Sequence, residues 1–149
     1  MSLDAFLKYG DPLTETSMFL YNVPRNLQVG KIPKRVYCNR DLVEPLAKAF
    51  KNLIDRKLVA ELESWDGCFN IRPIRGFEKP YNVFKAKEDV KQYQYLSKHA
   101  WGLAIDVNAS KNRLGQTPTL TKSFVECFTD AGFVWGGNFK RKDGMHFEI

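Results

Sequence analysis

The chain has few of the residues that most often hold metal ions. Among its 149 residues are only two histidines, His99 and His146, and three cysteines, at 38, 68 and 127. The cysteines are odd in number, widely spaced and without a CxxC pair, which excludes a thiolate zinc knuckle and a disulfide framework. We therefore expect three buried free thiols.

Long apolar runs, internal repeats and low-complexity tracts are also missing. Nowhere do eighteen apolar residues follow one another, and the first residues lack a basic stretch followed by an apolar run. We expect that the protein does not insert into a membrane. We also expect that it is made in the cytoplasm without a signal peptide of its own. Length and a hydrophobic content of 44% favour one folded domain over residues 1–149.

Charge of one sign is in excess. There are 23 Lys and Arg residues against 17 Asp and Glu, a net charge of +6, which favours anionic partners such as nucleic acid or an anionic cell wall. Many surface cations are simply solvated, and the longest basic cluster, 140–142, is short. Because no helix-turn-helix, knuckle or stacked-aromatic motif accompanies the charge, we expect no nucleic-acid partner.

The first half of the chain predicts one helix and a pair of strands. Pro, Gly and Asn residues over 11–34 predict an extended or looped lead-in. Apolar residues at three- and four-residue spacings predict an amphipathic helix over 41–56, capped by Asn39 or Asp41. Near-alternating apolar residues over 59–74 predict strands in a hairpin turned at Asp66-Gly67.

The second half predicts a sheet with one more helix. Residues 85–98 are polar and favour a solvated loop with room for a helical turn, and 101–107 favours a buried strand. Helical spacing over 121–131, with Gly132 at the C-cap, is followed by strand-like aromatic residues over 133–149. This order predicts an α+β fold with a central antiparallel sheet flanked by helices. Residues 65–149 would carry the motifs, with 1–58 part of the same unit.

Both histidines lie in Gly-containing, largely apolar segments that also hold a carboxylate, SKHAWGLAID and KDGMHFE. A catalytic zinc site uses three protein ligands and an open position for water. His99, Asp106 and His146 supply that number. His99 and Asp106 are seven positions apart, which places them on opposite faces of a straight strand, so we expect His99 on the preceding loop, reoriented by Gly102 or a turn.

Two further residues predict hydrolysis at such a site. Asp143 lies three residues before His146 and is placed to act as general base on water activated by zinc. Arg72, at the end of a predicted strand, is a candidate to hold substrate or stabilise a tetrahedral oxyanion.

Each of these residues also has a structural interpretation. A single histidine in an apolar stretch is more often a satisfied core residue than a ligand. Asp106 and Asp143 could be turn residues, and Arg72 and Arg75 could be surface charges. Taken together, the structural interpretations are weaker than the functional one. They require that the only two histidines and two acids fall into this arrangement by chance.

The segments SKHAWGLAIDVN and GFVWGGNFKRKDGMHFE resemble the family of zinc peptidases that contains D-alanyl-D-alanine carboxypeptidases, L-alanyl-D-glutamate endopeptidases and many bacteriophage endolysins. The family pattern is a Ser two residues before a zinc His, then Gly and a zinc Asp, and later an acid three residues before the second zinc His. The residues that keep this pattern are Ser97, His99, Gly102, Asp106, Asp143 and His146.

The resemblance implies one zinc ion, a small fold of the same α+β type and hydrolysis of peptidoglycan stem peptides. DGCFNIRPIRG resembles the family strand that carries a substrate-positioning arginine, a role that falls on Arg72 first and on Arg75 as the alternative. Ser97, Arg75 and Trp135 are candidates for substrate contacts, although tryptophans such as Trp135 more often belong to the core. The insertion 78–96 departs from shorter members and bears on the shape of the cleft.

The resemblance leaves the cleaved bond open, between L- and D-residues or between D-residues. It favours a monomeric endolysin that accumulates in the cytoplasm and reaches the wall after the membrane fails. The alternative is a non-catalytic wall-binding or structural phage module that retains the fold and the metal.

Overall fold

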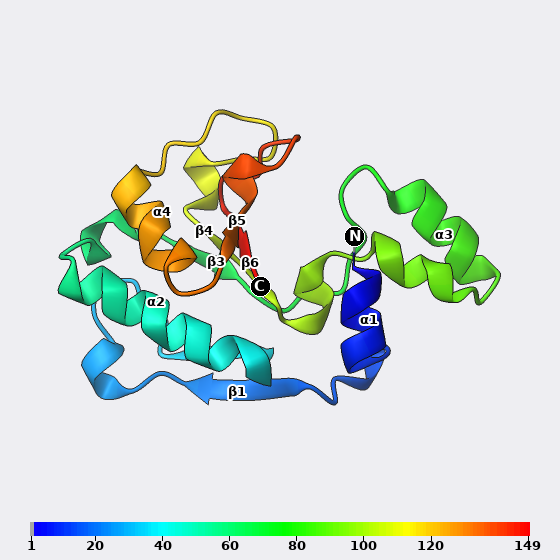
Figure 1. The fold of residues 1–149 in the computed structure, drawn as a ribbon, viewed down its shortest axis with the longest axis horizontal. Coiled ribbons are helices and arrows are strands. Elements are labelled where there is room, and N and C mark those ends of the chain that lie inside the picture. The colour runs from blue at the N-terminus through cyan, green and yellow to red at the C-terminus, as the bar shows by residue number, and fades with distance from the viewer. Residues whose placement is uncertain (1) are drawn as a thin grey trace.

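The computed structural model describes residues 2–149, which form helices and two antiparallel sheets (Figure 1). The predicted α+β class is confirmed. The helices and strands are α1 (Leu3–Tyr9), β1 (Met18–Asn22), β2 (Arg35–Asn39), α2 (Val43–Asp55), β3 (Trp65–Gly67), α3 (Glu78–Ala86), β4 (Ala104–Val107), α4 (Lys122–Thr129), β5 (Val134–Trp135) and β6 (His146–Glu148). Short 3-10 turns connect them, at Pro12–Thr14, Arg25–Leu27, Arg40–Leu42, Val59–Glu61, Val90–Tyr95, Lys98–Trp101, Ala109–Lys111 and Gly136–Asn138.

Both predicted amphipathic helices are present. α2 and α4 pack against each other and bury their apolar faces in one core, where Phe50, Phe124 and Phe128 are fully buried. Asn39 caps the 3-10 turn that leads into α2, since its side chain accepts a hydrogen bond from the backbone N–H of Asp41 at 2.9 Å. The predicted helix over 41–56 is thus present, but its first residues form the 3-10 turn Arg40–Leu42 and α2 itself begins at Val43.

The sheet that positions the site has four strands in the order β3-β4-β6-β5, all antiparallel. In its centre β4 pairs with β6, so that Asp106 lies directly opposite His146. Phe147, the residue between His146 and Glu148, points to the other face and is fully buried against Phe128. One face of β6 therefore belongs to the core and the other face carries the polar residues.

The hairpin predicted over 59–74 is wrong. β3 has only three residues, and Asp66-Gly67 lies within it rather than at a turn. The backbone after β3 pairs with a distant segment instead: Ser97 N–H donates to Arg72 O at 3.0 Å and Ile74 N–H donates to Tyr95 O at 2.7 Å. Local alternation cannot reveal such a long-range partner.

The loop predicted over 85–98 contains the helical turn for which the prediction left room, the 3-10 turn Val90–Tyr95, but the sequence analysis missed α3, which ends at Ala86. No side chain of α3 is buried, which removes the apolar periodicity that would identify a helix. The ring of Phe84 in α3 stacks on the ring of Tyr95 in the 3-10 turn, which holds these two elements together. This helical hairpin lies beside α1, away from α2 and α4 (Figure 1).

The predicted lead-in over 11–34 contains a strand that its turn residues did not reveal. β1 pairs with β2 in a separate two-stranded sheet, with Leu20 opposite Tyr37. All three cysteines are buried free thiols, as predicted.

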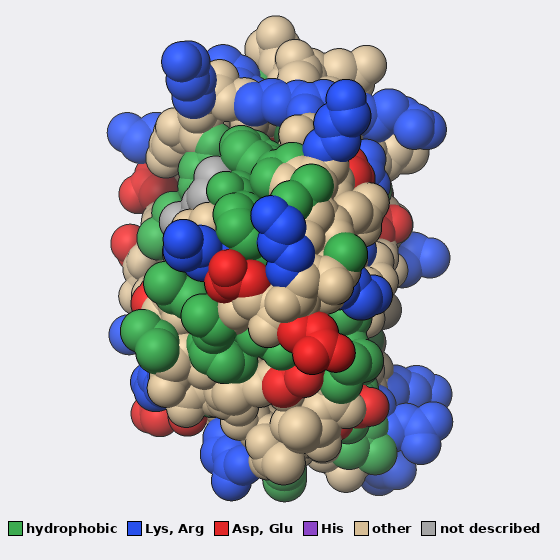
Figure 2. Space-filling model, turned by 90° about the vertical axis from the view of Figure 1, so that its right-hand side faces the viewer, with side chains coloured by type: hydrophobic (Ala, Val, Ile, Leu, Met, Phe, Trp, Pro, Cys, Tyr) green, Lys and Arg blue, Asp and Glu red, His purple; other side chains and the backbone are tan. Residues whose placement is uncertain are grey.

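The exposed surface carries both hydrophobic and basic side chains. On the face formed by α1 and α3, hydrophobic side chains group in the upper and middle part, with Lys and Arg side chains both among them and around the margins (Figure 2). The most exposed of the large apolar residues are Leu7 and Leu13. Among residues 2–149, no helix has both the length and the apolar character needed to cross a bilayer.

Candidate metal centre and cleft

Three side chains from two distant parts of the chain, 99–106 and 146, meet on the polar face of the central sheet. Asp106 comes from β4, His146 from the facing position of β6, and His99 from the 3-10 turn Lys98–Trp101 that precedes β4. One potential ligand atom from each residue lies within 4.8 Å of the other two. The prediction that His99 lies on the loop before the strand, with Asp106 on the strand itself, is confirmed.

Gly102 makes the turn that brings His99 to this face. It adopts a left-handed conformation, with φ of 65°, and closes the turn by donating its N–H to His99 O at 3.0 Å. A β-carbon here would lie 2.6 Å from the backbone nitrogen of Asn39. Both the conformation and the space therefore require glycine.

Hydrogen bonds fix which nitrogen each imidazole presents. His99 Nδ1 lies 2.6 Å from the carbonyl oxygen of Cys68, so this nitrogen carries the proton and donates it. His146 Nε2 lies 2.8 Å from Glu148 Oε1 and donates in the same way. The lone pairs of His99 Nε2 and His146 Nδ1 are then free, at 3.2 and 3.5 Å from the two carboxylate oxygens of Asp106.

These free atoms fit a metal ion. His99 Nε2 and His146 Nδ1 are buried and have no hydrogen-bond partner among residues 2–149. A buried polar atom without a partner is costly, and a metal ion satisfies it. Ligands of a tetrahedral zinc ion at 2.0–2.1 Å lie roughly 3.4 Å from one another, which is close to the two separations from Asp106.

The charges of the site favour a cation as well. Burial acts to raise the pKa of Asp106, but the neighbouring imidazoles of His146 and His99 outweigh it and hold this pKa well below its usual range. Burial acts to lower the pKa of His146, but Asp106 and Glu148 outweigh it and raise the pKa to about 9. Before a metal binds, a proton on His146 supplies the positive charge that the two carboxylates attract.

Asp143 borders the same centre. Its Oδ2 lies 3.9 Å from His146 Nδ1, and its Oδ1 is buried without a hydrogen-bond partner among the described residues. Burial raises its pKa above the ordinary value of a carboxyl, which improves its match to a proton-transfer role near neutral pH. Glycine at position 136 allows this placement, because a β-carbon there would overlap with the backbone oxygen of Asp143.

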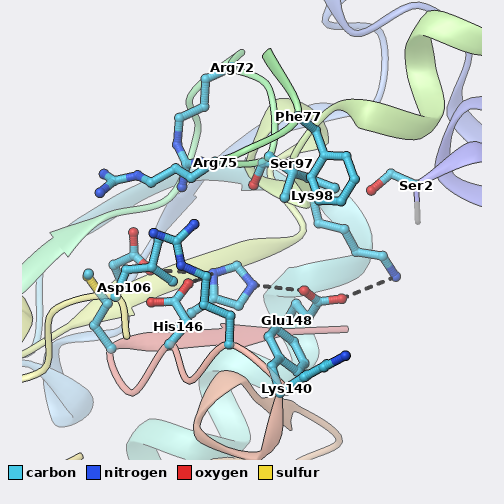
Figure 3. Close-up of a pocket in the computed structure, with 16 residues that line it drawn as sticks. Ser2, Arg72, Arg75, Phe77, Ser97, Lys98, Asp106, Lys140, His146 and Glu148 are labelled. Carbon is cyan, nitrogen blue, oxygen red and sulfur yellow. Dashed lines mark hydrogen bonds and ion pairs between the residues drawn. The ribbon is translucent and has the colours of Figure 1, made fainter. Parts of the chain in front are cut away.

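A cleft of about 680 Å³ opens over the centre (Figure 3). Both candidate arginines line the cleft, but they differ in burial: Arg72 is half-buried and Arg75 is exposed. The charge of Arg72 also opposes the rise in the pKa of Asp143, after the larger effects of burial and His146. Arg72 is thus the candidate arginine whose charge acts on the acid.

Ser97 and Trp135 occupy different places. Ser97 lines the cleft, and its hydroxyl accepts a hydrogen bond from the N–H of His99 at 3.3 Å. Trp135 is not among the residues that line the cleft: its ring stacks on Phe147 and its Nε1–H donates to Gly144 O at 2.8 Å. Trp135 therefore holds the loop that carries Asp143.

Glu148 is a site residue that the sequence analysis missed. It lies two residues after His146 on one strand, which puts both side chains on the same face, so strand alternation was the available signal. Its second oxygen lies 3.7 Å from Lys98 Nζ (Figure 3). The carbonyl of Cys68, which orients His99, carried no sequence signal, because any residue supplies a carbonyl.

The three-residue His-Asp-His group beside a cleft on the antiparallel sheet can hold a metal ion, and Asp143 lies next to it. A family model described as D-alanyl-D-alanine carboxypeptidase matches residues 91–149, which contain all three metal-binding residues and Asp143. The resemblance found in the sequence is thereby confirmed over this part of the chain, and it supports a metallopeptidase in general. No curated protein and no solved structure matches the chain.

Proposed function

We propose that this protein is a zinc-dependent peptidase that hydrolyses stem peptides of peptidoglycan. One observation carries the proposal: the free nitrogens of His99 and His146 converge with Asp106 at the bottom of a cleft that also contains Asp143, an acid whose Oδ1 is buried without a hydrogen-bond partner among the described residues. The family match over residues 91–149 supports the substrate class. When bound, zinc would supply Lewis-acid activation of water and of the scissile carbonyl.

The residues around the centre divide the remaining work. Asp143, whose free Oδ1 is buried beside the centre, takes the proton of the attacking water and returns it to the leaving amine. Arg72 donates hydrogen bonds to the oxyanion that forms as the carbonyl is attacked. His99, Asp106 and His146 hold the ion, and the carbonyl of Cys68 and the carboxylate of Glu148 keep the imidazoles in the required tautomer.

Two reactions fit this site: cleavage between L-alanine and D-glutamate, and removal of a terminal D-alanine. We further propose an endolysin-like monomer that is made in the cytoplasm without a signal peptide and acts on the wall after release. Its net charge of +6 supports attraction to an anionic wall.

A wall-binding module without activity is the competing function. Such a module has no need of a buried acid beside the ligand set, since an unpaired carboxyl lowers stability without helping to bind the wall. Asp143 is kept and Gly136 makes room for it. Both observations favour catalysis.

Mass analysis of digested peptidoglycan tests the proposal. Zinc-loaded protein at neutral pH should release new amino termini from purified peptidoglycan, and the masses of the fragments would identify the cleaved bond. Asp143→Asn protein serves as the matched control, with zinc bound and no fragments released. If the zinc-loaded protein sediments with peptidoglycan but releases no fragments, the binding module is the correct function.

A further inference from the structure

The cleft carries more positive charge than its own acids neutralise. Three carboxylates line it, and each already faces a partner or the metal centre: Asp106 faces both imidazoles, Glu148 faces His146 and Lys98, and Asp143 faces His146. The cations that line the cleft number five, Arg72, Arg75, Lys98, Lys140 and Arg141.

Only one of these cations is paired. Lys98 lies 3.7 Å from Glu148 and 3.9 Å from Asp4. Within residues 2–149, none of the other four forms an ion pair. Unpaired cations that face one concave site attract an anionic ligand into it.

Two of the unpaired arginines lie on opposing loops. Arg75 precedes Gly76 on the loop after the Arg72 segment, and Arg141 lies on the loop that leads to Asp143. The side chain of Arg141 reaches across to the other loop, because a β-carbon at Gly76 would lie 3.6 Å from Nη1 of Arg141. Arg141 therefore ends beside the residue that follows Arg75, and both arginines line the cleft.

Unpaired cations border the cleft on both sides of the centre. Figure 3 shows Arg75 reaching over the Asp106 side of the centre, while Glu148 and Lys98 lie on the other side of His146. On that other side Lys98 is paired with Glu148 at 3.7 Å, whereas Lys140 is unpaired, so Arg75 is the labelled cation nearest to the Asp106 side. A planar guanidinium pair is matched to a planar carboxylate, which it binds with charge-assisted hydrogen bonds.

We propose that Arg75 and Arg141 form a carboxylate-binding subsite, which makes the enzyme select stem peptides whose carboxyl group beside the scissile bond is free rather than amidated. This inference rests on the proposed function, since the ligand is the peptide that the centre cleaves. Arg72 is left to the oxyanion, and the new element is the contribution of Arg141 from the facing loop.

Synthetic stem peptides test the subsite. One peptide carries all carboxyl groups free, and its analogues have the D-glutamate carboxyl or the C-terminal carboxyl amidated, one at a time. For the wild-type protein one amidation should lower kcat/KM about tenfold or more, the usual effect of losing a hydrogen bond to a charged group. In Arg75→Gln/Arg141→Gln protein the ratio of free to amidated peptide should fall to about one.

The control is Arg113→Gln, which removes an exposed guanidinium that does not line the cleft. It removes one positive charge, as each substitution in the double variant does, and should keep the wild-type ratio. All three substituted arginines are exposed, so thermal unfolding of the variants should match the wild type. A ratio that stays unchanged in the double variant, or that falls equally in the control, overturns the subsite.

Binding separates failure of the subsite from failure of the proposed function. The dissociation constants of the same peptides, measured by calorimetry on chelator-treated protein, should show the same preference for the free carboxyl group. If no peptide is cleaved but the preference persists and is lost in the double variant, the subsite stands and the peptidase function is wrong. If peptides are cleaved without any preference, the subsite alone is wrong.

Discussion

Asp143 and His146 lie three positions apart on one loop-strand junction, yet the structure gives them different tasks. His146 Nδ1 faces Asp106 and is free to bind metal, whereas Asp143 is farther from that nitrogen, at 3.9 Å, and keeps Oδ1 unpaired. Metal binding and proton transfer should therefore be separable by mutation.

We predict that Asp143→Asn retains zinc and lowers kcat about 100- to 10,000-fold, the usual range for a lost general base. His146→Ala should lose the metal itself. Zinc content by atomic absorption, measured beside turnover of a stem peptide, checks both. Equal loss of metal in the two variants would remove the role assigned to Asp143.

Glu148 acts one contact away from the metal centre. Its carboxylate accepts the proton of His146 Nε2 at 2.8 Å, which fixes the tautomer that presents Nδ1. Glu148→Ala should weaken zinc binding about 10- to 100-fold, as is usual when such a supporting carboxylate is removed. Competition with a chromophoric chelator measures this affinity directly.

Glu148→Gln is the matched control, since an amide oxygen can still accept the proton of His146 while the charge is gone. We expect its affinity for zinc to lie between those of the wild type and Glu148→Ala. Wild-type affinity in Glu148→Ala would show that His146 needs no such support.

At the scale of elements, the turn before β4 determines whether the site can form. Gly102 has a φ of 65°, and its missing side chain leaves room for the backbone of Asn39, which donates its N–H to Gly102 O at 3.0 Å. This contact joins the turn to the end of β2. Any side chain at Gly102 would push these two segments apart.

Gly102→Ala should lower the free energy of unfolding by about 2 kcal/mol or more, because a left-handed alanine costs about 1–2 kcal/mol and the steric clash adds to it. Gly115→Ala is the control: Gly115 also has a positive φ, 85°, but a β-carbon there meets nothing within 4 Å. Urea unfolding of both variants isolates the steric part. Equal losses of stability would mean that the contact with Asn39 is unimportant.

The elements that could be predicted from sequence are those that bury a periodic apolar face. α2 and α4 do so, and both were predicted within a few residues. α3 buries no side chain and β3 depends on pairing with β4, so neither leaves a local pattern. The periodicity of apolar residues in a sequence reveals a helix or a strand only where that element buries one of its own faces.

The same reasoning applies to the site. His99, Asp106 and His146 were predictable because two scarce histidines stood beside acids at family spacing, and the structure brings the three together. The contribution proposed for Arg141 could not be foreseen, because it depends on the side chain of Arg141 reaching Gly76 from the loop before β6. Proximity between separate loops leaves no mark in local sequence.

For the whole molecule, the metal centre joins parts of the chain that are far apart in sequence. His99 lies on the turn before β4, Asp106 on β4 and His146 on β6. An ion held by all three should stabilise the folded state, since the unfolded chain has no preformed site. Removal of the metal by a chelator should therefore lower the melting temperature.

This stabilisation should depend on pH with a definite sign. In chelator-treated protein the pKa of His146 is raised from 6.5 to about 9, so its proton stabilises the fold fully below pH 6.5, and this contribution is lost as pH rises through 9. Zinc must displace that proton, so its affinity should rise about tenfold per pH unit between 6.5 and 9. At fixed free zinc, each unit adds about 1.4 kcal/mol to the stabilisation.

Thermal scans at pH 6.5, 7.5 and 8.5, with zinc held by a metal buffer and with chelator alone, measure the effect. The gap between the two melting temperatures should widen at each step, by about 3–6 °C per pH unit for a chain of this size. Asp106 adds nothing to this slope, because its lowered pKa keeps it ionised throughout. In Glu148→Ala the pKa of His146 loses one of its two supports, so the gap should stop widening at a lower pH than in the wild type. A gap that is constant from pH 6.5 to 8.5 would show that His146 is not the proton that zinc displaces.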